Sequence, residues 1–202
     1  GREALLIHFR TLPSHTQYAA QQLLEQLDVI EEQIYQFEQR MRKVFASTQD
    51  LKIVMSLPGV GFILGVVILS EVGDVGRFPS AEHLASYAGT TPRVHASGGK
   101  IRYGQMRSDV NRYLKWAFIE AANTICLNRR RYPYRHVSRL YEHIRGRRGH
   151  QKAIGAVARH LAEATYWILK KGESYKEPHI SCSFRPREDK RGCVLSSKKL
   201  GT

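Results

Sequence analysis

Residues 50–74 read DLKIVMSLPGVGFILGVVILSEVGD, and this stretch indicates the fold class. Two short apolar segments flank the turn LPGVG, in which Pro58 sets the bend. The pattern predicts two helices joined by a tight turn, as in a helix-hairpin-helix. In that motif, glycines such as Gly59 and Gly61, which flank Val60, let the backbone approach a phosphate, and the second helix presents its N-terminal N–H groups. A plain helical hairpin without such contacts is the alternative.

The segment before this hairpin predicts one long helix over residues 15–47. Its apolar residues are spaced alternately three and four apart, which is the 3.5-residue repeat of a coiled coil. We therefore expect a homodimer or tetramer joined through this helix, and the alternative is that the stripe packs on the chain's own body. The apolar seam comprises Ala20, Leu23, Leu27, Ile30, Ile34, Phe37, Met41 and Val44.

The segment after the hairpin predicts a short helix and then a glycine-rich loop. Ser80 is suited to cap a helix over residues 81–88, which Gly89 would end. Alternation in the loop RVHASGGKIRY allows a small β-hairpin with Gly98 and Gly99 at its turn.

Three more helices complete the predicted domain. The first ends at about Asn128, and Ser108 or Asp109 is expected to cap its start. The other two cover about residues 134–145 and 150–171, on either side of a segment that contains Gly146 and Gly149. Their apolar stripes comprise Val110, Leu114, Ala117, Phe118, Ala121 and Ile125 in the first helix, and Ile154, Val157, Leu161, Trp167 and Ile168 in the last.

The chain of 202 residues is long enough for one domain or two small ones. We expect a mainly α-helical protein, with a long coiled-coil helix followed by a compact helical domain that contains the helix-hairpin-helix. The predicted boundaries are residues 1–48 for the coiled coil, 49–171 for the domain, and 172–202 for a polar, basic tail that is expected to be disordered.

The net charge is strongly positive and unevenly spread. The chain carries a formal charge of +14, yet residues 1–50 hold five Lys/Arg against seven Asp/Glu. No acidic residue lies between Glu82 and Asp109. Such a basic field attracts polyanions and favours nucleic acid as the partner.

Clusters of basic residues are the candidate contacts to a nucleic-acid backbone. Tyr132 and Tyr134 interleave with one cluster and could stack on unpaired bases, whereas any single cation could equally be a solvated surface charge. The candidates are Arg107, Arg112, Arg129, Arg130, Arg131, Arg147, Arg148 and Lys152.

Several other classes of protein are not favoured. No apolar run approaches the ~20 residues of a membrane span, so we expect no membrane association. Three scattered cysteines do not suggest a disulfide framework, which favours a reducing cytoplasm. His179, Cys182 and Cys193 do not have the spacing of a zinc site, and the acidic residues show no paired-carboxylate pattern. We therefore expect no metal site and no cofactor bound by this chain.

Ser97 is the candidate nucleophile. A hydroxyl that attacks a phosphodiester must lose its proton, be aligned, and have the charge on the phosphate oxygens neutralised. Gly98 and Gly99 would let the backbone approach the phosphate, whereas a simple turn serine is the alternative. The cations nearest in sequence are candidates to supply that positive charge, and the lysine or the histidine could assist proton transfer; they are Arg93, His95, Lys100 and Arg102.

The order of the motifs resembles one known family. LPGVG is followed by SEVGDVGRFPSAEHLASYAGTTPRVHASGGK, then by a G-x-M-x-x-x-x-N-R-Y-L-K segment, and then by AVARHLAEATYWIL. Over about residues 15–171, this series is similar to the C-terminal half of the transposases of the insertion-sequence 110/116/902 group. These are DEDD-type recombinases, of which some are guided by a structured bridge RNA.

The resemblance implies a function and a site. Members of that family carry an N-terminal RNase-H-like domain with four metal-binding acidic residues, and a C-terminal domain whose serine becomes linked to a DNA 5′ phosphate. The matching residues here are Ser97 and, after it, Gly98, Gly99 and Lys100. Because no such N-terminal domain is recognised, we expect an excised fragment or a truncated relative, with Mg²⁺ needed only together with that domain.

The leading hypothesis is therefore the half of a transposase that cuts and joins DNA, in a bacterial or archaeal cytoplasm and associated with the nucleoid. DNA is the expected partner, and a structured guide RNA is a further candidate. A non-catalytic DNA- or RNA-binding dimerisation module is the alternative. A purely structural coiled-coil adaptor is disfavoured by the positive charge.

Overall fold

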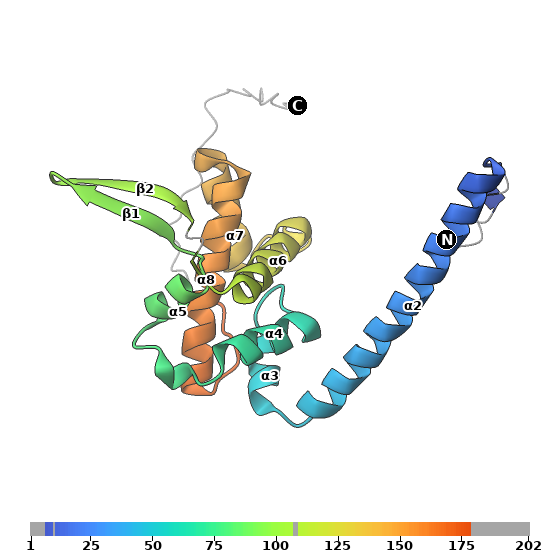
Figure 1. The fold of residues 1–202 in the computed structure, drawn as a ribbon. Coiled ribbons are helices and arrows are strands. Elements are labelled where there is room, and N and C mark those ends of the chain that lie inside the picture. The colour runs from blue at the N-terminus through green and yellow to red at the C-terminus, as the bar shows by residue number, and fades with distance from the viewer. Residues whose placement is uncertain (1–6, 10, 107–108, 179–202) are drawn as a thin grey trace, which may run out of the picture.

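The computed structural model describes residues 7–9, 11–106 and 109–178, and it is mainly α-helical, as predicted (Figure 1). From α2 onward, the chain forms a series of helices interrupted by one β-hairpin. The elements are α2 (Ser14–Phe45), α3 (Gln49–Met55), α4 (Phe62–Val72), the 3₁₀ turn η1 (Val75–Arg77), α5 (Ala81–Tyr87), β1 (Pro92–Ser97), β2 (Lys100–Met106), α6 (Arg112–Asn128), α7 (His136–Arg148) and α8 (His150–Lys171).

Helix α2 confirms the predicted long helix and extends away from the rest of the molecule (Figure 1). In the described part of the chain, none of its residues is buried. Seam residues such as Leu27 and Phe37 are 48% and 69% exposed, so the stripe does not pack on the described body of the chain. Near the C-terminal end of α2, the Arg42 guanidinium lies 4.7 Å from the centre of the Phe62 ring.

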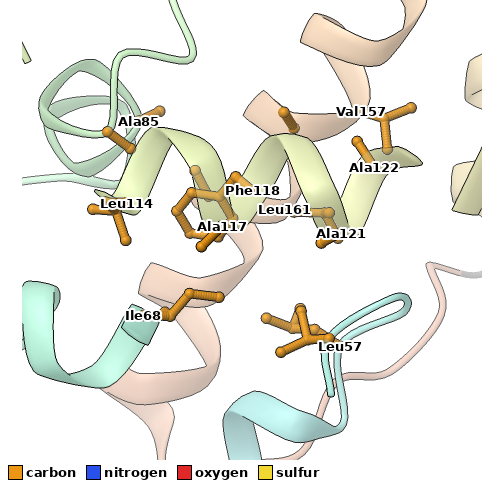
Figure 2. Close-up of a cluster of buried hydrophobic side chains, with 14 of the residues drawn as sticks. Leu57, Ile68, Ala85, Leu114, Ala117, Phe118, Ala121, Ala122, Val157 and Leu161 are labelled. Atoms are coloured by element: carbon orange, nitrogen blue, oxygen red, sulfur yellow. The ribbon is translucent and has the colours of Figure 1, made fainter. Parts of the chain in front are cut away.

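The compact domain is built around α8, which contacts α3, α5, α6, α7 and η1. Helix α6 approaches its neighbours closely because its buried positions include the small residues Ala117, Ala121 and Ala122. Figure 2 shows this packing, with Phe118 of α6 and Leu161 of α8 in one apolar cluster. These two side chains are fully buried, so this cluster is the core that fixes the orientation of α6.

The helical hairpin predicted from LPGVG is confirmed as α3 and α4. Its turn packs on α6, because a Cβ placed on Gly59 would collide with the carbonyl oxygen of Ala121 and lie 3.2 Å from Cγ1 of Ile125. Val60 is buried in the same core, and its N–H donates to the Leu57 carbonyl. Packing therefore accounts for the first two residues of the Gly-Val-Gly sequence.

The start of α6 differs from the prediction. Asn111 is the N-cap, since its side-chain Oδ1 accepts a hydrogen bond from the Leu114 N–H at 3.0 Å. Asp109 is therefore not the cap, and Ser108 lies outside the described residues. Val110 precedes the helix and packs against Gly89, where a side chain would collide with it. Asn111 is selected because the backbone of α5 holds it in place, with its N–H donating to the Tyr87 carbonyl.

Ser80 occupies the predicted N-cap position of α5, but its side chain makes no capping hydrogen bond to the helix backbone. Its hydroxyl instead pairs with Nδ1 of His83 at 2.9 Å. The helix ends as predicted, with Gly89 in a left-handed conformation at φ 66°.

The C-terminal helices differ from the prediction in two details. Gly146 lies within α7, which continues to Arg148, so only Gly149 separates the two helices. Trp167 does not belong to the buried stripe of α8, because it is 51% exposed, whereas the neighbouring Ile168 is buried. The apolar stripe therefore passes beside the indole and does not include it.

Residues 172–178 are attached to the helices through Tyr175 and Glu177, whereas the sequence predicted disorder from position 172. The Tyr175 N–H donates to the Ser56 hydroxyl at 2.7 Å, and the Glu177 carboxylate accepts from the His136 N–H at 2.9 Å. Tyr175 also packs on the hydrophobic core. This segment thus ties the end of α8 to α3 and to the start of α7, and residues 179–202 lie outside the described residues.

Candidate functional site

The β-hairpin that carries Ser97 is formed as predicted. Strands β1 and β2 pair in antiparallel fashion, and Gly98 and Gly99 form the turn with φ of 58° and 74°. Two successive left-handed residues suit a turn that matches the twist of a hairpin, and glycine adopts them without strain. Ser97 is therefore the last residue before the turn, and it is exposed to solvent.

The hairpin extends away from the helical body, and its turn forms the outer end (Figure 1). The register pairs Ser97 with Lys100, and His95 with Arg102. Directly paired residues, and residues two apart on one strand, belong to the same face of a hairpin. The backbone therefore places Ser97, Lys100, His95 and Arg102 at positions on one common face.

Arg93 lies at the other end of the hairpin. A strand rises about 3.3 Å per residue, so the four residues from Arg93 to Ser97 span about 13 Å. A register shift between Pro92 and Val94 falls at this point, and a guanidinium nitrogen of Arg93 lies 3.6 Å from a carboxylate oxygen of Asp109. The structure thus places Arg93 at the base of the hairpin and not beside the serine.

A network of hydrogen bonds lies where the hairpin joins the body. The Asn111 side-chain amide donates to the Glu71 carboxylate at 2.5 Å and to the Tyr87 hydroxyl at 3.2 Å. The hydrogen bond from Asn111 is the largest cause that lowers the pKa of Tyr87, and a hydrogen bond from Arg77 adds to it. The Arg77 guanidinium also lies 4.9 Å from the centre of the Tyr87 ring.

This network was not among the predicted site residues. Its members come from α4, η1, α5 and the N-cap of α6, and Glu71 and Asn111 are 40 residues apart in sequence. Asn111 does occur in the G-x-M-x-x-x-x-N-R-Y-L-K segment, and this motif is the sequence feature that could have identified it as a site residue. The network fixes the point at which the chain passes from the hairpin region into α6.

The turn between α3 and α4 offers one open position. Gly61 is exposed, a Cβ placed on it would meet no atom within 4 Å, and it precedes the first turn of α4. Gly59 and Val60, in contrast, face the core. If this turn contacts a phosphate, the contact is therefore expected at Gly61 and the N-terminus of α4.

The basic candidates that the structure describes divide into one engaged residue and several exposed ones. Arg129 is engaged within the chain, because its Nε donates to Glu142 at 2.7 Å and its Nη1 donates to the Cys126 carbonyl at 2.7 Å. Arg107 lies outside the described residues. The others are exposed, at the start of α6, in the loop after α6, and around the junction of α7 with α8; they are Arg112, Arg130, Arg131, Arg147, Arg148 and Lys152.

No metal centre is found in the part of the chain that the structure describes. No group of three or more His, Cys, Asp or Glu residues there is arranged to hold an ion. The described helices also include none that is both long and apolar enough to cross a bilayer.

Comparison with known proteins identifies a family. Residues 51–138 match the model of the transposase IS116/IS110/IS902 family. The chain is 31% identical over 156 residues to the insertion element IS110 uncharacterized 43.6 kDa protein of Streptomyces coelicolor, covering 76% of this chain and 37% of the relative. It is 27% identical over 153 residues to the transposase for insertion sequence element IS1111A of Coxiella burnetii, covering 72% and 40% respectively.

A third similar protein is the insertion element IS116 uncharacterized 44.8 kDa protein of Streptomyces clavuligerus, at 32% identity over half of this chain and 26% of the relative. The chain thus spans about two fifths or less of the length of these relatives. The family match covers α3 to the start of α7, and it therefore includes the serine hairpin and the Asn111 network.

Proposed function

Since the chain belongs to the IS116/IS110/IS902 family of transposases, we propose that it binds DNA and cuts and joins strands through a covalent intermediate on Ser97. The observation that carries this proposal is the position of Ser97 beside the glycine turn of an exposed hairpin. A hydroxyl at the end of such an arm can reach a phosphate on a duplex while the helical body stays outside the groove.

The proposed reaction is a transesterification. The Ser97 Oγ attacks a backbone phosphorus, a new O–P bond forms, and the bond from phosphorus to the 3′ oxygen breaks. The serine proton passes to a base, and the leaving 3′ oxygen takes up a proton, so that a 5′ phosphoserine and a 3′ hydroxyl result. Attack of another strand's 3′ hydroxyl on the phosphoserine reverses these steps and joins the strands.

Charge on the phosphate must be neutralised during attack. The register places Lys100 opposite Ser97 and Arg102 one pair further along the same face, which suits both residues for this role. Arg93 is better suited to hold the base of the hairpin through Asp109. His95 lies two residues from Ser97 at a position on the same face, which makes it a candidate to accept the serine proton.

None of the proposed reaction steps uses a Mg²⁺ ion bound by the described residues of this chain. The described residues provide no set of ligands that fits such an ion. We propose that any Mg²⁺ required by the complete reaction is held by residues beyond those described, such as the acidic domain that the family resemblance implies.

We further propose that α2 joins two or more copies of the chain. Strand exchange needs paired DNA sites, and an exposed apolar seam of more than three heptads is suited to associate with a second copy. The basic surface after α6 and at the junction of α7 with α8 would then hold DNA, and it would equally suit a structured guide RNA. The site of action would be the nucleoid.

A second candidate is a nucleic-acid-binding module without catalysis. It is favoured by the exposed setting of Ser97 at the outer end of the hairpin. In that case the hairpin would be a contact arm, and the serine would be one more polar group on it.

A covalent protein–DNA product would distinguish the transposase from the non-catalytic binding module. The chain would be mixed with labelled DNA that carries an element junction, with Mg²⁺ and the separately expressed N-terminal part of a full-length relative, with and without candidate guide RNA. We expect a protein–DNA band on a denaturing gel that is lost in Ser97→Ala and kept in Ser70→Ala, an exposed serine on α4. Equal duplex binding without a covalent band in either protein would support the binding module.

A further inference from the structure

The loop between α6 and α7, residues 129–135, carries aromatic side chains to which the proposed function gives no role. Its sequence is RRRYPYR, so that two tyrosines flank Pro133 and four arginines surround them. It is a tight, ordered turn, because the N–H groups of Arg131 and Tyr132 both donate to the Asn128 carbonyl. The Arg135 N–H in turn donates to the Tyr132 carbonyl at 3.3 Å.

The loop is anchored at both ends. Arg129 is fixed by its hydrogen bonds to Glu142 and to the Cys126 carbonyl, and its guanidinium lies 5.7 Å from the centre of the Tyr141 ring. At the other end, Arg135 is the N-cap residue of α7, and the following N–H, of His136, donates to the Glu177 carboxylate. The turn is therefore held in one conformation, which lowers the entropy that a bound ligand must overcome.

The carboxylates at the two ends of the loop are already engaged. Glu142 pairs with Arg129 at 2.7 Å and with Arg145 at 3.4 Å, and Glu177 accepts from the backbone of α7. Arg130, Arg131 and Arg135 outnumber the one carboxylate of the two that has no arginine partner, Glu177, so the exposed surface of the loop is positively charged.

The two tyrosines have different environments. The guanidinium of Arg135 lies 4.2 Å from the centre of the Tyr132 ring, and that of Arg131 lies 5.6 Å from it. Tyr132 is thus part of a cation–π group within the loop. Tyr134 is 89% exposed, the most exposed of the large hydrophobic side chains that the structure describes. Its ring is open for contact with another molecule.

We propose that the α6–α7 loop is a stacking site for an unpaired base of a nucleic acid, with Tyr134 as the ring on which the base lies. This inference rests on the proposed function, because it takes nucleic acid as the ligand. A planar base stacks on an aromatic ring regardless of its sequence, while nearby arginines attract the backbone phosphates. In a duplex the faces of the bases are covered by their neighbours, so the loop selects unpaired strands.

The loop is separate from the serine hairpin. The hairpin joins the body near the start of α6, whereas the loop follows the end of this helix. The 17 residues of α6 span about 25 Å, which corresponds to about seven base pairs of a duplex. An unpaired base held at the loop would thus lie well away from a phosphate under attack.

The test compares single-stranded and duplex oligonucleotides of one sequence, in DNA and in RNA, each with one 2-aminopurine base. Equilibrium binding and base fluorescence would be measured for the full 202-residue chain and for Tyr134→Ala, Tyr134→Phe and Tyr35→Ala. Tyr35 is 58% exposed on α2 and lies off the seam, so its variant controls for the loss of an exposed tyrosine.

We expect Tyr134→Ala to weaken single-strand binding about 5- to 150-fold and to relieve the quenching of 2-aminopurine. Duplex binding should change less than about twofold, and Tyr134→Phe and Tyr35→Ala should behave like the wild type. The DNA and RNA arms show which strand is held more tightly. Thermal melting of each variant verifies that the fold is retained.

Two results would overturn the inference alone. These are single-strand affinity that is unchanged in Tyr134→Ala, and a loss that is equal for single strand and duplex. If the wild-type chain binds neither single strands nor duplexes in a salt-dependent way, the proposed function fails together with the inference. Intact duplex binding therefore distinguishes the two failures.

Discussion

Gly59 lies directly against the backbone of Ala121, so that the turn between α3 and α4 rests on α6 without room for a side chain. The glycine also has φ of 78°, a conformation that other residues adopt only with strain. The close contact and the backbone conformation together explain a glycine at this position. They leave Gly61, two residues later, as the position of the turn that faces solvent.

Replacing these two glycines should therefore have different effects. We predict that Gly59→Ala lowers the free energy of unfolding by about 2–4 kcal/mol, because of backbone strain and the collision with α6. Gly61→Ala should change it by less than about 1 kcal/mol, since its φ is −95° and the space around it is open. Urea unfolding of both variants is the measurement. Equal losses would contradict the assigned packing.

Asn111 should contribute to stability through three hydrogen bonds. We predict that Asn111→Ala lowers the free energy of unfolding by about 1–3 kcal/mol, because the Leu114 N–H and the Glu71 carboxylate lose their partner. The control is Asn128→Ala, whose side chain only donates to the Thr124 carbonyl within the same helix. It should change stability by less than about 0.5 kcal/mol in the same urea experiment.

The same variant should change the titration of Tyr87. The Asn111 side chain is the main cause that lowers the pKa of this tyrosine, so Asn111→Ala should raise the pKa towards its ordinary value. NMR of the protein labelled with ¹³C at the tyrosine Cζ would follow the titration, and Tyr87→Phe would assign the signal. An unchanged pKa in Asn111→Ala would show that the hydrogen bond is not formed in solution.

Stability should depend on pH through His160. Burial lowers the pKa of His160, and the neighbouring His136 lowers it further. The unfolded chain therefore binds the proton more tightly than the folded chain does. The stability contributed is fully present above the unfolded value of about 6.5 and is lost as the pH falls towards the folded pKa.

We predict that the free energy of unfolding falls below about pH 6.5, and that His160→Gln reduces this dependence. The exposed His15 on α2 offers the control, and His15→Gln should keep the wild-type slope. Urea unfolding at a series of pH values provides the test. A wild-type slope that survives in His160→Gln would assign the effect to other groups.

Association through α2 should depend on the seam. We predict that Ile30→Lys with Ile34→Lys raises the dissociation constant of the assembly by at least about 100-fold, because charged groups replace apolar contacts. Val29→Lys with Tyr35→Lys changes residues of similar exposure beside the seam and should have little effect. Sedimentation equilibrium of the two double variants would decide, and equal dissociation would exclude a specific seam.

Much of the helical fold could be predicted because its signals are local. The apolar spacing in α2, α6 and α8 follows directly from helical periodicity, and the glycine pair at positions 98 and 99 indicates the hairpin. Apart from its C-terminal end, the long helix also proved not to pack on the described body, although its seam alone could not exclude that.

The remaining features depend on contacts that are distant in sequence. The α6 cap is Asn111 because Tyr87 and Glu71 lie beside it, which no local pattern reveals. The segment at 172–178 is polar and without period, yet Tyr175 and Glu177 anchor it to α3 and α7.

The candidate site was also predicted in part. The position of Ser97 beside a glycine turn follows from the sequence, and a turn at Gly98 and Gly99 places Lys100 opposite the serine. Arg93 lies about 13 Å from Ser97 along the strand because the hairpin is extended. At that position it pairs with Asp109. Arg129 is recognised as a structural residue only when its contacts with Glu142 and Cys126 are seen.

The most direct test of the central claim is to map the covalent link itself. After the strand-joining reaction, the protein would be digested with nuclease and protease and its peptides sequenced by tandem mass spectrometry. The account predicts a nucleotide remnant on the hydroxyl of Ser97, absent from Ser97→Ala and retained in Ser70→Ala. A remnant on another residue, or strand joining by Ser97→Ala at the wild-type rate, would contradict it.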